Sequence, residues 1–469
     1  MNLARARTLA AYAVLAAAAV VLVLRAAQPL DNLDTYFHLR FGHEFRTGAW
    51  SLRHPGSVST FATADWVPTQ WLPQVVMARV EEWLGLPGVA WLSGLLFLTL
   101  ALAVYVACRR QAEPLVAAIV VALALEACTS GMSMRPQQIS YLLVVVTTAT
   151  WLRARESGRV PWWLVPLTWV WTMCHGMWPI GIVIGLVAVA GLALDREQPR
   201  PVLLRMLAVP LLSAAVSLLT PVGPGLFGAV LRVSSRRQYF YEWGPPDFTE
   251  FPSIVLLALL ALAVVPRLRS APVPWFDLLL IGLAALSAVY SQRTVPVAAC
   301  LVAPFAALGL QSLVGVRPPV PRLERLLVAA GYALSLVVLA LAVPHTADKP
   351  LATPAWLDGA LGDLPAGTPV VDETAFGGYL MWRFPQLDLV IHGYGDTFTD
   401  TELERNADLD SARGGWRELL RATGAHYAVL PPGSPLAYDL REIEHWRVLE
   451  RSPDLELLQA PPGWVEDSH

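Results

Sequence analysis

Long apolar runs, separated by short polar loops, fill most of the chain up to Pro344. Runs of roughly 17 to 25 residues are long enough to cross a membrane as helices. They occur near residues 8–24, 88–108, 114–130, 137–153, 177–194, 201–220, 252–268, 274–290, 294–314 and 322–343. A shorter Trp-rich run near 161–174 fits either a re-entrant segment or a further span. Counting it as a span gives about eleven transmembrane helices, and we expect a polytopic α-helical membrane protein.

The composition agrees with a membrane protein. Of the 469 residues, 55% are hydrophobic and only 15% are charged, whereas soluble domains typically carry about 25% charged residues. The net charge of −3 gives no sign of a nucleic-acid partner. The four cysteines lie far apart without metal-ligand spacing, so we expect neither a disulfide nor a cysteine metal site.

Arginines predict the orientation of the chain in the membrane. Arg5 and Arg7 precede the first apolar run, which fits a signal peptide or an uncleaved helix. Its length and the lack of an Ala-x-Ala-like site favour the helix. With eleven spans, the loops on the side of the N-terminus hold Arg109, Arg110, Arg153, Arg155, Arg159, Arg196, Arg200, Arg205, Arg267, Arg269, Arg317, Arg322 and Arg325. The positive-inside rule then predicts a cytoplasmic N-terminus and an extracytoplasmic segment after Pro344.

The pattern changes after Pro344 to short strands alternating with short helices. Strands are predicted at 370–371, 387–391, 427–430, 446–449 and 455–458, and helices near 375–384, 400–410, 413–423 and 434–443. A segment of ~120 residues suits one small α/β domain. We therefore expect a transmembrane domain at 1–345, with its first external loop at about 29–86, and a C-terminal extracytoplasmic α/β domain at 350–469. This domain is expected to be a lid or an acceptor-binding module, with a purely structural role as the alternative.

The predicted external loops hold most of the chemically capable side chains. The first loop opens with Asp31, Asp34, His38 and Arg40, directly after the first helix. Later external loops contain Arg135, His175, Arg232, Arg236, Arg237, Glu242 and Arg293. A carboxylate can accept the proton of an acceptor hydroxyl, and arginine binds phosphate oxygens in bidentate fashion. An enzyme that works on a lipid headgroup needs both at the membrane surface.

The first loop also carries a recognisable motif. The segment Asp34-Thr-Tyr-Phe-His38-Leu-Arg40 resembles the Asp-x-aromatic-aromatic-Asn/His-x-Arg pattern at the start of the first external loop in oligosaccharyltransferase catalytic subunits. Those proteins belong to the GT-C class of membrane glycosyltransferases, which use polyprenyl-phosphate sugar donors. The resemblance implies a GT-C-like fold, with Asp34 as the base or a metal ligand and Asp31 as its helper.

Two further expectations concern these carboxylates. Their spacing of three predicts that Asp31 and Asp34 lie on one side of a helical turn. Carboxylates and phosphates together suit Mg²⁺ or Mn²⁺, so a divalent cation held by Asp34, Asp31 and His38 is a further hypothesis.

A second resemblance covers roughly residues 10–460. The order of motifs is similar to that of a family of bacterial integral membrane proteins related to the GT-C class. The shared motifs are the first-loop segment, Gln70-Trp-Leu, Arg135-Pro-Gln, His175-Gly, Thr220-Pro-x-Gly, Glu242-Trp, Arg293 and Gly377-Gly-Tyr-Leu-x-Trp. The sequence departs from the family at His392-Gly-Tyr-Gly-Asp396, where many members have Asp-Gly-Arg-x-Asp.

These resemblances imply a glycosyltransferase of a bacterial plasma membrane that moves a hexosyl or pentosyl group. The donor would be a polyprenyl-phosphate sugar, the acceptor a glycan, lipid or protein outside the cytoplasm, and the surroundings membrane lipids. Asp34 would deprotonate the acceptor in an inverting transfer. Substrate and phosphate would be bound by His38, Arg40, Arg135, His175, Arg232, Arg236, Arg237, Glu242 and Arg293.

Alternative interpretations remain at this point. The chain could be a non-catalytic binder or transporter of lipid-linked glycans in cell-envelope assembly. An ion-coupled transporter would need acidic residues at mid-membrane, whereas Glu126 and Asp277 lie near the ends of predicted spans. Residue by residue, the first-loop acids could form a solvated boundary, His175 could be an interfacial histidine, and the arginines could cap helices or contact lipid headgroups. The enzyme hypothesis requires that the external side chains meet in one pocket.

Overall fold

The computed structural model describes residues 3–268, 272–315, 320–349, 351 and 353–464, which leaves Arg269 and Arg317 of the predicted cytoplasmic loops outside the described residues. The chain divides into two compact units, which we describe separately. The helical unit comprises Met1–Gln28, Leu84–Gly228 and Phe240–Asp348. The mixed unit comprises Pro29–Trp83, Ala229–Tyr239 and Lys349–His469.

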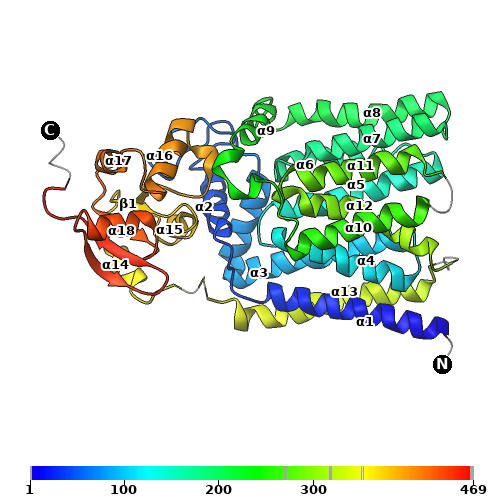
Figure 1. Ribbon diagram of the computed structural model, residues 1–469, viewed down its shortest axis with the longest axis horizontal. Coiled ribbons are helices and arrows are strands. Elements are labelled where there is room, and N and C mark those ends of the chain that lie inside the picture. The colour runs from blue at the N-terminus through cyan, green and yellow to red at the C-terminus, as the bar shows by residue number, and fades with distance from the viewer. Residues whose placement is uncertain (1–2, 269–271, 316–319, 350, 352, 465–469) are drawn as a thin grey trace. The chain divides into compact units, whose positions relative to one another are not determined.

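The helical unit is a bundle in which every predicted apolar segment forms a helix (Figure 1). Its helices are α1 (Leu3–Ala26), the second part of α3 (Trp71–Arg109), α4 (Pro114–Ala127), α5 (Gln137–Ser157), α6 (Leu164–Cys174), α7 (Pro179–Asp195), α8 (Arg200–Val216), α10 (Phe251–Leu268), α11 (Trp275–Tyr290), α12 (Val295–Ser312) and α13 (Arg322–Thr346). Short 3₁₀ turns lie between them: η1 (Thr129–Gly131), η2 (Ser217–Leu219), η4 (Tyr241–Trp243) and η5 (Gln292–Thr294). Helix α9 (Gly225–Ser235) runs from this unit into the other.

The lengths of these helices bear on the predicted membrane spans. Among the described residues, six helices are long and apolar enough to cross a membrane, and four shorter apolar helices have 10 to 17 residues. The predicted span at 137–153 lies within α5. The apolar helices of a membrane protein are therefore confirmed, while their number as spans, about eleven, stays a prediction.

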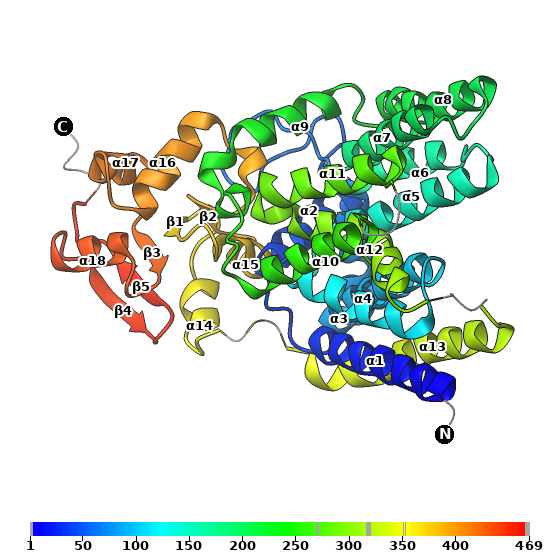
Figure 2. The same ribbon diagram turned by 45° about the vertical axis from the view of Figure 1, so that its right-hand side comes forward.

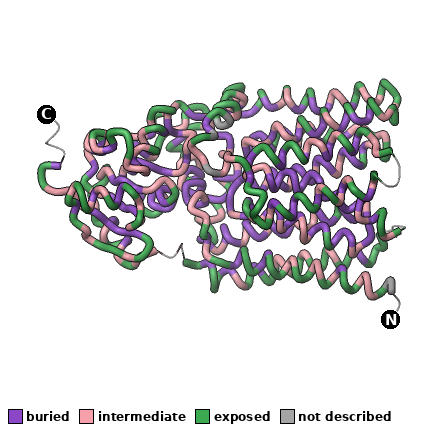
Figure 3. The backbone as a smooth tube through the Cα atoms, in the orientation of Figure 1, coloured by how far each residue is buried: buried purple, intermediate pink, exposed green. Residues whose placement is uncertain are grey.

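Helix α12 is the core of the bundle. It packs against α4, α5, α10 and α11. In its most apolar stretch 83% of the residues are buried, compared with 11% in α13. Figure 3 marks the buried and exposed residues along the bundle. Small residues make the close packing possible: a Cβ at Gly309 would overlap the backbone carbonyl of Leu262 in α10. Such small-residue contacts are typical of helix packing in membranes.

Buried ion pairs hold the bundle at the helix ends that are predicted to be cytoplasmic. Arg109 donates to both carboxylate oxygens of Glu324, at 2.6 and 2.9 Å, which joins α3 to α13. Asp277 of α11 is buried and pairs with Arg155 at 3.0 Å and with Arg267. The acidic group considered for a transporter is thus neutralised by two arginines, which assigns Asp277 a role in packing.

The mixed unit contains a five-stranded sheet in the order β2-β1-β3-β5-β4 (Figure 2). Its strands are β1 (Pro369–Asp372), β2 (Asp388–Leu389), β3 (Tyr427–Leu430), β4 (Arg447–Arg451) and β5 (Glu456–Gln459). Strand β1 is parallel to β2 and β3, and the β3–β5 and β5–β4 pairs are antiparallel. Each strand overlaps one of the segments predicted as strands from the sequence.

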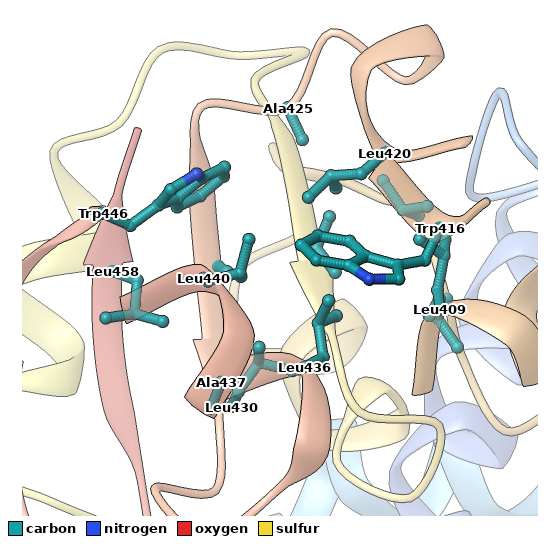
Figure 4. Close-up of a cluster of buried hydrophobic side chains, with 14 of the residues drawn as sticks. Leu409, Trp416, Leu420, Ala425, Leu430, Leu436, Ala437, Leu440, Trp446 and Leu458 are labelled. Carbon is teal, nitrogen blue, oxygen red and sulfur yellow. The ribbon is translucent and has the colours of Figure 1, made fainter. Parts of the chain in front are cut away.

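Helices from the C-terminal segment pack around this sheet. They are α14 (Leu357–Gly362), α15 (Gly377–Arg383), α16 (Asp400–Asp410), α17 (Trp416–Ala422) and α18 (Pro435–Glu442), with the 3₁₀ turn η6 (Gly395–Thr397). The core contains Trp416 and Leu420 of α17, Leu436 and Leu440 of α18, and Leu458 of β5 (Figure 4). The predicted small α/β fold is therefore present.

The first loop belongs to the same unit as this sheet. It contributes α2 (Asp34–Thr47), the first part of α3, and a connecting segment. The connecting segment forms hydrogen bonds to the C-terminal segment Lys349–His469, which we call the tail. The Thr63 hydroxyl donates to Glu402 at 2.6 Å, and the amide of Ala64 donates to the carbonyl of Thr397 at 2.9 Å. The 3₁₀ turn η3 (Arg237–Tyr239) follows α9 in the second segment of the unit.

The long helix α3 changes direction where the units meet in the sequence. Gly85 has φ 66° and ψ −166°, so the helical hydrogen bonding is interrupted, and Pro87 follows. This backbone conformation favours glycine because it has no Cβ. The break divides α3 into a first part in the mixed unit and a second part in the helical unit.

Candidate active site

Four of the predicted site residues meet at one end of the helical unit, although they are far apart in sequence. Arg135 lies in the loop before α5, His175 follows the last residue of α6, Glu242 lies in η4 and Arg293 in η5. We call these four residues the arginine cluster. Because Arg135 precedes the first residue of α5 and Arg155 lies in its last turn, the cluster is at the opposite end of the bundle from the Asp277 ion pairs.

The two arginines of the cluster share one carboxylate. Arg135 Nη1 lies 2.8 Å from Glu242 Oε1, and Arg293 Nη1 lies 3.6 Å from Glu242 Oε2. The guanidinium group of Arg293 also lies over the ring of Trp243, 5.3 Å from its centroid. Arg135 is buried, while the Glu242 side chain keeps 41% of its surface exposed. The pair of arginines thus forms an anion-binding arrangement that an exposed acidic side chain occupies.

The arginines of the cluster favour the ionised form of the Glu242 carboxyl. Burial by itself raises the pKa of Glu242, but the guanidinium groups of Arg293 and Arg135 outweigh it, so the pKa of this carboxyl is lowered. The carboxylate is therefore ionised at neutral pH and carries one negative charge against two positive ones. The three side chains together keep a net positive charge.

His175 connects the cluster to the interior of the bundle. Its Nδ1 lies 3.0 Å from Ser140 Oγ, and its Nε2 lies 3.4 Å from Arg293 Nη2. The amide of Met177 also donates to Nδ1, at 3.4 Å. Trp171 Nε1 donates to the same Ser140 oxygen at 2.8 Å. Ser140 was not predicted as part of the site, because a serine within an apolar helix gives no sequence signal.

The end of α1 lies beside the loop that carries Arg135. Arg25 Nε donates to the carbonyl of Met132 at 3.2 Å. Asp34 follows Arg25 closely in the sequence, after α1 ends at Ala26. The first loop therefore leaves the helical unit at the end of the bundle that carries the arginine cluster.

Within the mixed unit, Asp34 is the first residue of α2. The side-chain oxygen of Asn32 accepts from the Asp34 amide at 3.1 Å, which starts the helix at this residue. Asp31 lies before the helix and is exposed. The expectation that Asp31 and Asp34 share one side of a helical turn is wrong, because the Asn32 side chain occupies the position from which the helix begins.

The other first-loop candidates already have partners. His38 is buried, and its Nδ1 lies 3.0 Å from the Gln74 side-chain nitrogen of α3. Arg40 pairs with Glu44 at 2.8 Å, one turn further along α2. Their proposed roles in substrate binding stay predictions.

The arginines at 232–237 are tied to other parts of the mixed unit. Arg232 donates to the carbonyl of Asp65 at 2.9 Å. Arg236 is buried, pairs with Asp400 at 2.7 Å and donates to the carbonyl of Gly395 at 3.3 Å. Arg237 begins η3, and its side chain lies outside the described part of the structure. The contacts of Arg236 fasten η3 and its flanking segment to the tail, and phosphate binding by these arginines stays a prediction.

The tail reaches Asp34 through residues that sequence reasoning left unassigned. We call His392–Asp396 the 392–396 loop. A Cβ built on Gly393 would lie 3.7 Å from Asp34 Oδ1, and Arg236 bonds to Gly395 in the same loop. One acidic and one basic candidate therefore border the same loop, and the glycines of the motif were the available sequence signal.

The hypothesis of a bound metal ion lacks a ligand set. In the part of the chain that the structure describes, no three His, Cys, Asp or Glu side chains are grouped so that they could hold a metal ion. His38 already uses one ring nitrogen for Gln74. We therefore derive no reaction step through Mg²⁺ or Mn²⁺.

Comparison with known proteins was made at the level of sequence and of structure. No family model matches the chain, and no curated protein matches it significantly. Solved structures do match. The oligosaccharyltransferase AglB of Archaeoglobus fulgidus, in complex with an inhibitory peptide and a dolichol-phosphate, has a TM-score of 0.56 and 12% identity, covering 90% of this chain and 69% of that chain. Another structure of the A. fulgidus enzyme, in complex with Zn and sulfate, has a TM-score of 0.50 and 11% identity, covering 89% and 68%.

A second protein matches over nearly the whole length of both chains. ArnT of Cupriavidus metallidurans, bound to undecaprenyl phosphate, has a TM-score of 0.55 and 16% identity, covering 97% of this chain and 98% of that chain. At such identities the likeness concerns the fold. The resemblance predicted from the first loop is confirmed at that level: this chain is similar in fold to the GT-C membrane glycosyltransferases.

Proposed function

We propose that this protein is a membrane glycosyltransferase that transfers a sugar from a polyprenyl-phosphate donor to an acceptor outside the cytoplasm. The observation that carries the proposal is the arginine cluster, in which two arginines from separate loops converge on one anionic group at the end of a helical bundle. The solved structures of similar fold include complexes with dolichol-phosphate and undecaprenyl phosphate. A lipid phosphate is the ligand that this chemistry would recognise.

Arg135 and Arg293 are proposed to bind the phosphate of the donor. Guanidinium groups form charge-assisted, bidentate hydrogen bonds to phosphate oxygens. His175 Nε2 lies beside Arg293 and holds this arginine towards the cluster. Placement at the helix ends lets the polyprenyl chain stay in the bilayer while its phosphate reaches the arginines. The donor phosphate gains charge as the glycosidic bond breaks, so fixed positive charges stabilise the transition state.

Asp34 is proposed as the base. The acceptor oxygen attacks the anomeric carbon, the bond between that carbon and the phosphate oxygen breaks, and the electron pair leaves with the polyprenyl phosphate. The acceptor proton passes to the Asp34 carboxylate, and the configuration of the sugar inverts. This step requires an acceptor oxygen within hydrogen-bond reach of the Asp34 carboxylate.

The same proposal sets the orientation and the surroundings. The predicted external side of a bacterial plasma membrane would carry the arginine cluster and the C-terminal domain, with the N-terminus in the cytoplasm. Arginines are enriched at the opposite helix ends, as the positive-inside rule expects of the cytoplasmic side. Acceptors in that compartment are glycans, lipids and proteins.

The test is turnover of a defined donor. Purified full-length protein in liposomes is supplied with radiolabelled polyprenyl-phosphate sugars, one hexose and one pentose series, and with a membrane extract as the acceptor. Release of free polyprenyl phosphate, together with transfer of label, supports the enzyme. Asp34→Asn should abolish release without loss of folded protein, and Asp358→Asn, at an exposed ion pair of the same unit, is the matched control. Binding without release in every series would instead establish the alternative, a carrier of lipid-linked glycans.

A further inference from the structure

We infer that the C-terminal tail is a positioning element for the reaction centre. Helix α15 and the 392–396 loop hold α2 and thereby fix the location of Asp34, and Gly378 is the principal positioning residue. This inference rests on the proposed function, because it assigns the tail its role through Asp34. It differs from a lid or an acceptor-binding module, since the tail acts through α2 without touching the substrate.

At Gly378, helix α15 lies close to the backbone that precedes α2. A Cβ built on Gly378 would lie 2.6 Å from the carbonyl oxygen of Leu33 and 3.3 Å from the Phe37 ring. Leu33 directly precedes Asp34. A contact with a backbone atom cannot be relieved by a change of rotamer, so any side chain at position 378 must shift the first turn of α2 relative to α15.

Aromatic side chains fasten the two helices beside this contact. Tyr36 of α2 is fully buried, with its ring centroid 5.0 Å from those of Tyr379 and Trp382 of α15. The Tyr36 hydroxyl donates to the carbonyl of Leu30 at 2.8 Å and accepts from the amide of Leu351 at 3.0 Å. Aromatic pairs of this geometry are worth about 0.5–1.5 kcal/mol each beyond their buried area. The contact is therefore anchored and does not slide freely.

The 392–396 loop holds the other side of α2. The Tyr394 ring lies 5.0 Å from Phe37 and 4.8 Å from Phe41, centroid to centroid. The Asp34 carboxylate lies beside Gly393, where a Cβ would make an ordinary contact of 3.7 Å with Oδ1. Arg236 donates a hydrogen bond to the carbonyl of Gly395 and pairs with Asp400, and these two contacts hold the loop in place. Helix α2 is thus located by two separate parts of the tail.

The expected effect follows from the distances. An ordinary contact begins near 3.4 Å, so an alanine at 378 requires a displacement of about 0.8 Å from the 2.6 Å contact. A misplacement of about 1 Å can cost roughly 100-fold in rate when it disturbs the alignment of reacting groups. We expect Gly378→Ala to lower kcat by about 10- to 100-fold, while binding of undecaprenyl phosphate to the arginine cluster changes less than about twofold.

The experiment compares Gly378→Ala with Gly359→Ala, whose Cβ in α14 of the same unit would meet no atom within 4 Å. The readouts on the full-length protein are kcat for donor turnover, the Kd of undecaprenyl phosphate and hydrogen exchange of the amides of residues 33–38. Gly378→Ala should lower kcat and speed exchange at 33–38, and Gly359→Ala should do neither.

The outcomes separate the two proposals. If Asp34→Asn keeps transfer, the proposed base is wrong. If Asp34→Asn abolishes transfer but Gly378→Ala keeps wild-type kcat and exchange, the positioning role alone is wrong. Should Gly378→Ala fail to fold, Tyr394→Leu decides, because it removes the ring contacts with Phe37 and Phe41 of α2. That variant should lower kcat several-fold at constant Kd, and an unchanged kcat overturns the inference.

Discussion

Neutralising Glu242 should strengthen phosphate binding. Glu242 is the only acidic member of the arginine cluster as defined here, and its carboxylate lies 2.8 Å from Arg135 and 3.6 Å from Arg293. Its lowered pKa keeps it ionised against those two guanidinium groups. A lipid phosphate that binds the arginines must either displace this carboxylate or lie beside it. Glu242→Gln keeps the shape of the side chain and removes the competing charge.

The magnitude follows from Coulomb's law. For a phosphate charge about 5 Å from the carboxylate, the repulsion is about 3 kcal/mol at an effective dielectric constant of about 20. Because 41% of the Glu242 side chain is exposed, solvent screening roughly halves this value. The remaining ~1.5 kcal/mol corresponds to roughly tenfold in affinity. We expect the Kd of undecaprenyl phosphate to fall about tenfold in Glu242→Gln.

The assay is equilibrium binding of radiolabelled undecaprenyl phosphate to the full-length protein in mixed micelles at pH 7.5. Glu250→Gln is the control, since Glu250 accepts from Gln292 in the neighbouring segment. Arg135→Gln should weaken binding at least tenfold and show that the same site is measured. If Glu242→Gln binds undecaprenyl phosphate no more tightly than wild type while Arg135→Gln loses binding, Glu242 does not compete for the arginines, and the reasoning is refuted.

Three further predictions concern stability. Burial raises the pKa of Asp410 from 3.8 to about 6. Between these pH values the folded state therefore holds a proton that the unfolded chain releases. The contribution of this group to stability is present below about pH 4 and is lost as the pH rises to about 6. Unfolding followed by tryptophan fluorescence should therefore show Asp410→Asn gaining up to about 3 kcal/mol over wild type between those pH values, and a pH-independent difference would contradict this. Glu324→Gln leaves Arg109 buried with a weakened partner and should destabilise the protein by about 3–5 kcal/mol, against less than about 1 kcal/mol for Asp358→Asn at an exposed pair; equal losses would argue against the buried pair. Trp416→Ala should cost about 3–5 kcal/mol in the tail core, measured by denaturant unfolding, and a loss below 1 kcal/mol would show that the core tolerates the cavity.

Local patterns predicted the secondary structure well, because they depend on neighbours in the sequence. Helix α16 is an example: the prediction of 400–410 matches Asp400–Asp410, and the Thr399 side chain bonds to Glu402 in a capping box. Strand β3 likewise lies at Tyr427–Leu430, where a short apolar run of Tyr, Ala, Val and Leu occurs. Such signals are complete within a few residues.

The choice of partners could not be predicted in this way. The sequence placed Arg236 among phosphate-binding arginines, but its partner Asp400 is 164 positions away and no local pattern joins them. The start of α2 at Asp34 depends on one hydrogen bond, which the Asp34 amide donates to the side-chain oxygen of Asn32. Asp31 therefore lies before the helix. For the tail, the sequence shows Gly378 only as part of a shared motif, and only the structure shows the carbonyl of Leu33 against it.

The burial of α12 has a consequence for how such a protein can change over evolution. Bilayers of different thickness act on the helices that meet lipid, and here α13 and α1 present most of their apolar windows outwards, with 11% and 22% buried. The helix that directly follows Arg293 is shielded from that pressure at 83% buried. The lipid-facing residues of α1 and α13 can therefore change when the protein adapts to a membrane of different thickness. Helix α12, which positions Arg293, can stay unchanged.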